Sequence, residues 1–128
     1  MNPEIILVDD DEVLLAILEK MFHKVSPETK LRPFSSGRHA LDHLAKFPDS
    51  SQRRFLIVDI NLKDLTGWDF LNELIERKDS FSKVFLITSS VSSANSEIAK
   101  KYPSVIGFYE KPITFEKIEK ILNQIKED

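Results

Sequence analysis

The sequence has no cysteine, only three glycines and no long apolar run. The absence of cysteine excludes disulfides, thiolate catalysis and cysteine-based zinc sites. The chain also has no glycine-rich phosphate loop of the kind found in nucleotide- and flavin-binding domains. No apolar stretch approaches the roughly 20 residues of a membrane-spanning helix, and no signal peptide is visible. We therefore expect a cytoplasmic protein without membrane insertion.

Positive charge is not concentrated anywhere in the chain. Lysine and arginine form no run longer than two residues, and the net charge is −3. Nucleic-acid-binding domains usually carry a basic face, so we expect no nucleic acid among the partners.

The composition is that of an ordinary globular domain. The chain has 128 residues, of which 41% are hydrophobic and 30% are charged, and this is enough to bury a core. No linker, repeat or change in composition divides it. We expect residues 1–128 to be a single domain, with no separate output domain.

Short apolar runs of strand length alternate with longer stretches of helical period. The runs predict strands over residues 4–9, 30–34, 54–59, 83–88 and 105–110. Pro33 indicates that the second of these strands lies at an edge or an irregular position. Helices are expected over 11–24, 37–47, around 68–75, 94–101 and after the capping residue Thr114. This order predicts an α/β fold, (βα)₅, with a doubly wound five-stranded parallel sheet.

Helical spacing also predicts which side chains face the core. The expected inward-facing residues of the first helix are Val13, Leu14, Ile17, Leu18, Met21 and Phe22. Those of the later helices are Ala40, Leu41, Leu44 and Phe47, then Trp68, Leu71, Leu74 and Ile75, and finally Phe115, Ile118, Ile121, Leu122 and Ile125.

Reactive polar residues stand at the ends of four predicted strands. Asp9 and Asp10 end the first, Asp59 the third and Thr88 the fourth, and Lys111 follows the fifth. The carboxyl ends of the strands line up along one edge of an open parallel sheet, where ligands bind. Carboxylates, a hydroxyl and an ammonium gathered at that edge indicate a divalent-cation and phosphoryl site.

Four motifs, in order and each after its own strand, give the chain a resemblance to a known family. The motifs are Val8-Asp9-Asp10-Asp11, Val58-Asp59-Ile60-Asn61 with Gly67 downstream, Ile87-Thr88-Ser89 and Phe108-Tyr109-Glu110-Lys111-Pro112. Together they resemble the receiver domain of two-component response regulators, with a CheY-like, flavodoxin-like fold. The resemblance covers essentially the whole chain.

The resemblance implies a role for each residue of the acidic group. Asp59 would be the phospho-acceptor, because an ionised carboxylate is a usable nucleophile. Asp10 and Asp59 would bind Mg²⁺ directly, with the backbone carbonyl of Asn61 as a third ligand, and Asp9 would act through water. Asp11 and Glu12 are assigned instead to the N-terminal cap of the following helix.

The remaining motif residues are assigned to the phosphoryl group and to the switch. Thr88 would donate its hydroxyl to a phosphoryl oxygen, and Lys111 would pair with Asp59 or the phosphate. Asn61 and Ser89 stand at phosphate-binding positions, Ser89 through its backbone N–H. Phe108 matches the switch aromatic of the family. The Lys111–Pro112 bond is expected to be cis, as is usual in the family.

The expected function is that of a phosphorylation switch rather than a metabolic enzyme. A histidine kinase or a histidine phosphotransfer protein would phosphorylate Asp59 in a Mg²⁺-dependent reaction and thereby change binding to a downstream protein. A receiver-like scaffold that binds partners without phosphorylation is the alternative. A phosphatase is disfavoured because Asn61 stands where a general acid is needed. Lys63 and Thr66 differ from the common family pattern, which predicts a more mobile loop after Asp59.

Overall fold

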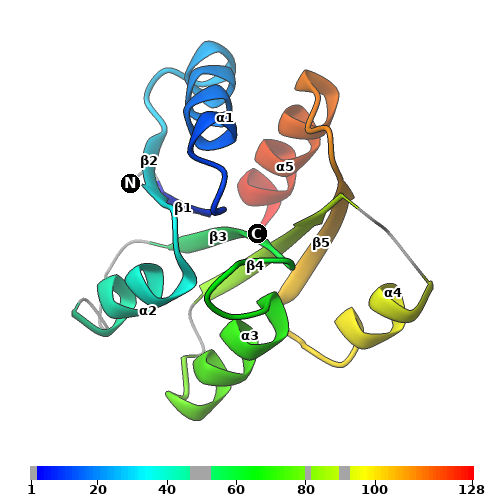
Figure 1. Ribbon diagram of the computed structural model, residues 1–128. Coiled ribbons are helices and arrows are strands. Elements are labelled where there is room, and N and C mark those ends of the chain that lie inside the picture. The colour runs from blue at the N-terminus through cyan, green and yellow to red at the C-terminus, as the bar shows by residue number, and fades with distance from the viewer. Residues whose placement is uncertain (1–2, 47–52, 80–81, 90–92) are drawn as a thin grey trace.

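The computed structural model describes residues 3–46, 53–79, 82–89 and 93–128 and shows one parallel sheet covered by helices (Figure 1). The strands are β1 (Glu4–Val8), β2 (Lys30–Phe34), β3 (Arg54–Asp59), β4 (Ser82–Thr88) and β5 (Val105–Glu110). They are all parallel and lie in the order β2-β1-β3-β4-β5. The predicted (βα)₅ fold is therefore confirmed.

The helices alternate with the strands along the chain. They are α1 (Glu12–Val25), α2 (Gly37–Lys46), α3 (Gly67–Glu76), α4 (Ser93–Ala99) and α5 (Phe115–Glu127). Helices α1 and α5 cover one face of the sheet, and α2, α3 and α4 lie on the other (Figure 1). In the described part of the chain, no helix is long and apolar enough to cross a lipid bilayer.

Strand position follows from side-chain character. Every residue of β1 and β3 is buried, as expected for apolar strands in the centre of a sheet covered on both faces. Strand β2 is mostly exposed and carries Pro33, which has no backbone N–H to donate. It lies at an edge of the sheet, as the sequence predicted.

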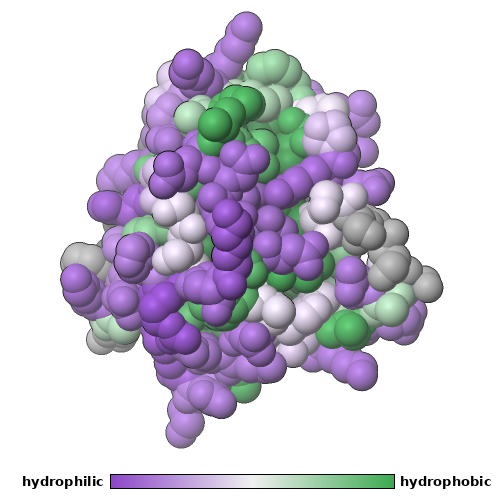
Figure 2. Space-filling model, in the orientation of Figure 1, coloured by the Kyte–Doolittle hydropathy of each residue, from purple (hydrophilic) through white to green (hydrophobic). Residues whose placement is uncertain are grey.

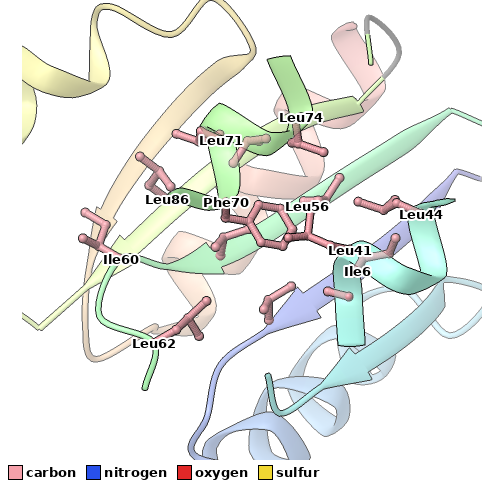
Figure 3. Close-up of a cluster of buried hydrophobic side chains, with 14 of the residues drawn as sticks. Ile6, Leu41, Leu44, Leu56, Ile60, Leu62, Phe70, Leu71, Leu74 and Leu86 are labelled. Atoms are coloured by element: carbon pink, nitrogen blue, oxygen red, sulfur yellow. The ribbon is translucent and has the colours of Figure 1, made fainter. Parts of the chain in front are cut away.

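Alternate residues of the strands build two apolar layers, one on each face of the sheet. Ile6 and Val8 belong to the layer under α2 and α3, whereas Ile5 and Leu7 belong to the layer under α1 and α5. Figure 3 shows the first layer, where side chains from β1, β3, β4 and helices α2 and α3 converge. Ile60 and Leu62, which follow β3, join the same layer and tie the chain after Asp59 to the core.

Helix α1 buries only part of the stripe that was predicted to face inward, and it also buries one residue outside that stripe. Leu15, Leu18 and Phe22 are buried, whereas Val13 is 71% exposed and Ile17 is 48% exposed. The helix is apolar around more than half of its circumference, so periodicity alone allows two inward stripes. Docking on the sheet selects one of them. The other forms an apolar patch over α1 that is visible on the surface (Figure 2).

Two smaller corrections concern helices α3 and α5. Ile75 is 57% exposed and Phe115 is 44% exposed, although both were expected to face the core. Phe70, which was not among the expected core residues of α3, is fully buried. The predicted inward residues Ala40, Leu41 and Leu44 of α2 are buried, and Phe47 lies outside the described residues.

Candidate metal and phosphoryl site

The sheet brings the predicted site residues to its carboxyl edge. Strands β1 and β3 are neighbours, with Val8 paired to Val58, so that Asp9 and Asp59 lie side by side at their ends. The backbone N–H of Lys111 donates to the carbonyl of Thr88 at 2.8 Å, which ties the end of β5 to the end of β4. Residues far apart in the sequence are therefore held together by the backbone of the sheet.

Three carboxylates meet at this edge. Asp9, Asp10 and Asp59 each offer an oxygen, and these oxygens all lie within 4.8 Å of one another. Asp9 is 1% exposed and Asp59 is 5% exposed, so that two of the three charges are buried. Buried carboxylates repel one another, and a cation relieves that repulsion. The set of oxygen donors suits Mg²⁺, which prefers oxygen ligands and retains several waters.

Lys111 is the cation already present in this group. Its Nζ lies 2.8 Å from Oδ2 of Asp9 and donates a hydrogen bond to Oδ2 of Asp59 at 3.1 Å. Burial lowers the pKa of Lys111, but its bonds to the two carboxylates outweigh burial and raise the pKa above the ordinary value. Lys111 therefore remains charged at neutral pH. One ammonium faces three carboxylates, so the site retains an excess of negative charge.

Burial has the opposite consequence for Asp9. It raises the pKa of Asp9, and the nearby charge of Asp59 adds to the increase, against the effects of Lys111 and of the Asp11 N–H. That N–H donates to Oδ1 of Asp9 at 2.9 Å. The Asp11 side chain accepts from the N–H of Leu14 and caps α1, so Asp11 has the helix-capping role assigned to it from the sequence. Burial and the charge of Asp59 thus disfavour the charged form of Asp9 in this site.

The sequence profile of the response regulator receiver domain matches residues 5–123. The chain belongs to this family. It is 21% identical over 126 residues to a probable methanogenesis regulatory protein, FilR2, of Methanothrix harundinacea, and the match covers 96% of this chain and 81% of that protein.

Solved structures of similar proteins have the same fold. A two-component response regulator from Legionella pneumophila is 25% identical with a TM-score of 0.84, covering 99% of this chain and 100% of that chain. The chemotaxis protein CheY4 of Vibrio cholerae is 19% identical with a TM-score of 0.81, covering 98% of this chain and 99% of that chain. At 19% identity, the likeness to CheY4 concerns the fold alone.

The other predicted site residues of this receiver domain have different surroundings. The backbone N–H of Asn61 donates to Oδ1 of Asp59 at 3.0 Å, while the Asn61 side chain is exposed. Thr88 is fully buried at the end of β4, and Ser89 follows it at the surface. Phe108 is half-buried and packs against the apolar layer under α2 and α3. The Lys111–Pro112 bond is cis, as predicted.

The loop after β3, residues 60–66, contains contacts that sequence reasoning missed. Asp64 accepts hydrogen bonds from the backbone N–H groups of Gly37 and Arg38, at the start of α2. Thr66 caps α3 in a reciprocal pair of hydrogen bonds with Asp69. The Thr66-to-Asp69 spacing is a recognisable capping signal, but no local pattern connects Asp64 with residues 27 positions earlier. The loop predicted to be more mobile is hydrogen-bonded at both Asp64 and Thr66.

Proposed function

We propose that this receiver domain accepts a phosphoryl group on Asp59, in a Mg²⁺-dependent reaction, from a histidine kinase or a histidine phosphotransfer protein. Phosphorylation would change its binding to a downstream protein. The observation that carries the proposal is the meeting of three carboxylates with Lys111 at one sheet edge. The cytoplasmic location and the single-domain organisation remain predictions from the sequence.

Asp59 has the surroundings of a nucleophile. Lys111 holds Oδ2 and the Asn61 N–H holds Oδ1, so that the carboxylate is fixed by a donor on each oxygen. A carboxylate oxygen would form a bond to phosphorus as the bond between phosphorus and the donor imidazole nitrogen breaks. The imidazole leaves with the electron pair of that bond, and the product is an acyl phosphate on Asp59.

Asp9, Asp10 and Asp59, with the carbonyl of Asn61, would hold Mg²⁺. The bound ion would neutralise carboxylate charge and shield the incoming phosphoryl oxygens. Lys111 would pair with the phosphoryl group through its mobile ammonium, and the Thr88 hydroxyl and the N–H of Ser89 would donate to it. These donors stand at the ends of two neighbouring strands, β4 and β5, so a single group would draw the two strand ends together.

Movement of Thr88 would provide the output of the switch. Leu86, two residues before Thr88 on β4, is paired with Phe108 of β5. If the Thr88 side chain turns toward a phosphoryl oxygen, it leaves space that the half-buried ring of Phe108 can enter. The surface around α4, β5 and α5 would then change its shape for a partner.

The test is phosphorylation by acetyl phosphate with and without Mg²⁺, measured by intact mass on wild type and on Asp59→Asn. We expect a Mg²⁺-dependent phosphoryl adduct on the wild type and none on the variant. Circular dichroism of the variant controls for folding. A wild-type chain that takes no phosphoryl group under any condition would overturn the proposal and favour a scaffold that binds partners without phosphorylation.

A further inference from the structure

We propose that Asp64 is a positioning residue that holds the loop of residues 60–66 and thereby sets the places of Asn61 and of the Asp59 carboxylate. This inference rests on the proposed function, since it concerns the same site. It assigns a role in metal binding to a side chain that does not belong to the acidic group.

The Asp64 carboxylate makes bonds on both oxygens. Oδ1 accepts from the N–H of Gly37 at 3.1 Å and of Leu65 at 3.1 Å, and Oδ2 accepts from the N–H of Arg38 at 2.8 Å. The N–H groups of Gly37 and Arg38 belong to the first turn of α2, where a helix has no partner of its own to offer. An acid from the loop thus caps a helix that precedes it by 27 residues.

Helix α2 is a firm anchor for this contact because it is tied to α3 as well. The guanidinium of Arg38 donates two hydrogen bonds to the carboxylate of Glu73, each at 3.0 Å. Arg77, the C-cap residue of α3, donates to the carbonyl of Leu41 of α2 at 2.7 Å. The loop runs from β3 to α3. Its middle is bonded to α2, and α2 is bonded in turn to α3, where the loop ends.

Close packing supports the same contact. A Cβ added at Gly37 would lie 2.8 Å from Cδ2 of Leu65 and 3.1 Å from Cδ1 of Leu62, so the loop touches the first turn of α2. Leu62 is 7% exposed and points into the apolar layer in Figure 3. The N–H of Gly67 donates to the carbonyl of Ile60 at 2.7 Å and closes the loop at its base.

The loop reaches the site through Asn61. The N–H of Asn61 donates to Oδ1 of Asp59 at 3.0 Å, and its carbonyl is the proposed backbone ligand. The side chain of Asn61 is exposed, so the backbone of the loop alone determines where these two groups lie. Release of Asp64 from α2 frees the loop only three residues from Asn61.

The experiment compares Asp64→Ala and Asp64→Asn with the wild type in the full chain. Two quantities are measured: the Kd for Mg²⁺ by titration calorimetry, and the hydrogen-exchange rate of the Asn61 amide by nuclear magnetic resonance. We expect Asp64→Ala to weaken Mg²⁺ binding about tenfold, at the low end of the range for residues that support metal ligands, and to speed the exchange. The Kd and the exchange rate of Asp64→Asn should lie between those of the wild type and Asp64→Ala, because the amide oxygen of Asn can still accept from the N–H groups of Gly37 and Leu65.

Asp42→Asn is the matched control. Asp42 lies on the exposed side of α2, and its charge also acts on Arg38. The variant removes an equal charge that also acts on Arg38 and should leave both the Kd and the exchange rate unchanged. An equal loss of affinity in Asp42→Asn would overturn the inference in favour of a general effect of charge.

The acetyl phosphate reaction of the same variants separates the two proposals. A wild type that binds Mg²⁺ but forms no adduct refutes the proposed function and leaves the role of Asp64 standing. A wild type that forms the adduct, with an unchanged Kd and exchange rate in Asp64→Ala, refutes the role of Asp64 alone. A wild type that binds no Mg²⁺ refutes that role directly.

Discussion

Two buried groups of charged side chains stand at opposite ends of strands β1 and β3, and they differ in charge balance. At the amino ends, Glu4 accepts from Nε of Arg32 at 2.8 Å and lies 3.6 Å from Nε of Arg54 and from Nε2 of His43. One carboxylate there faces two guanidiniums. At the carboxyl ends, the carboxylates of Asp9, Asp10 and Asp59 gather, and among the described residues the ammonium of Lys111 pairs with two of them.

The comparison shows how a structural cluster of charges differs from a functional one. Both groups contain side chains with little exposure, such as Glu4 at 8% and Asp9 at 1%. Burial of a charge is therefore no sign of function by itself. What distinguishes the carboxyl edge, among the described residues, is an excess of carboxylates over the ammonium of Lys111, and this excess suits a divalent cation.

The largest effect is expected from Glu4→Gln. Removal of this carboxylate removes the ion pair that Glu4 makes with Arg54, which is 4% exposed. Loss of one partner of a buried ion pair costs about 3 to 5 kcal/mol of unfolding free energy. Urea unfolding measures this loss, and Glu76→Gln, at an exposed position on α3, should change stability little. Equal stability of the two variants would contradict the structural role of the amino-edge group.

The second prediction concerns the carboxyl edge and the stabilisation of the folded state by Mg²⁺. Mg²⁺ at a hundredfold excess over its Kd should stabilise the wild type by about 2.7 kcal/mol, because it binds only the folded state. Asp10→Asn should lose this gain, since one of the three metal-facing carboxylates is removed. Urea unfolding with and without Mg²⁺ measures both quantities.

Without Mg²⁺, Asp10→Asn should be at least as stable as the wild type, because it relieves repulsion among the three carboxylates. Neutralising a carboxylate would then destabilise the protein at the amino edge of the sheet, in Glu4→Gln, but not at the carboxyl edge, in metal-free Asp10→Asn. A clear loss of stability in metal-free Asp10→Asn would remove the distinction between the two groups.

A third prediction compares two glycines on the carboxyl side of the sheet, at the starts of α3 and α2. Gly67→Ala should cost about 1 to 3 kcal/mol, as is typical of overpacking, because its Cβ would lie 2.9 Å from Cα of Ile60, a backbone atom. At Gly37 the nearest atom to the added Cβ is the side-chain methyl Cδ2 of Leu65, which can move. Gly37→Ala is therefore the milder control in thermal unfolding. Equal losses would show that the turn after β3 is not under special constraint.

The smallest effect is a pH dependence that arises from Asp64. Burial raises the pKa of Asp64, but its bonds from the N–H groups of Arg38, Gly37 and Leu65 outweigh burial and lower it below the ordinary 3.8. A lowered pKa means that the stabilisation is fully present above the unfolded-state value and is lost as the pH falls through the folded-state value. The stability difference between wild type and Asp64→Asn should be constant above about pH 5 and should shrink below pH 3.8. A difference that grows on acidification would contradict the capping role.

Much of the fold could be predicted because local patterns are strong where strands are central. The predicted strand over 54–59 coincides with β3 in the centre of the sheet, and Thr114 caps α5 as expected. Helix α1 was harder to predict, because its apolar residues extend around more than half of its circumference, and only docking decides that Leu15 is buried while Val13 and Ile17 are exposed. Periodicity reports that a face is apolar but not whether another element covers it.

The candidate site also has features that the sequence predicts and features that it does not. Asp59, Thr88 and Lys111 could be placed at one edge from the sequence, because parallel strands end together and each residue follows its own strand. The hydrogen bonds of Asp64 to α2, and the matching group of Glu4, Arg32 and Arg54 at the other edge, could not be predicted. They join residues of ordinary polar type across long sequence separations, and no local spacing identifies such partners.

The sequence alone determined the order of elements, the receiver-domain family and the residues that gather at the carboxyl edge. These features depend on short segments of the sequence, because the residue types in each segment have their own conformational or chemical preference. Only the tertiary structure decided which stripe of α1 is buried, that Lys111 lies between Asp9 and Asp59, and that Asp64 holds the loop beside them. Such contacts depend on distances between elements, and those distances are set when the helices pack on the sheet.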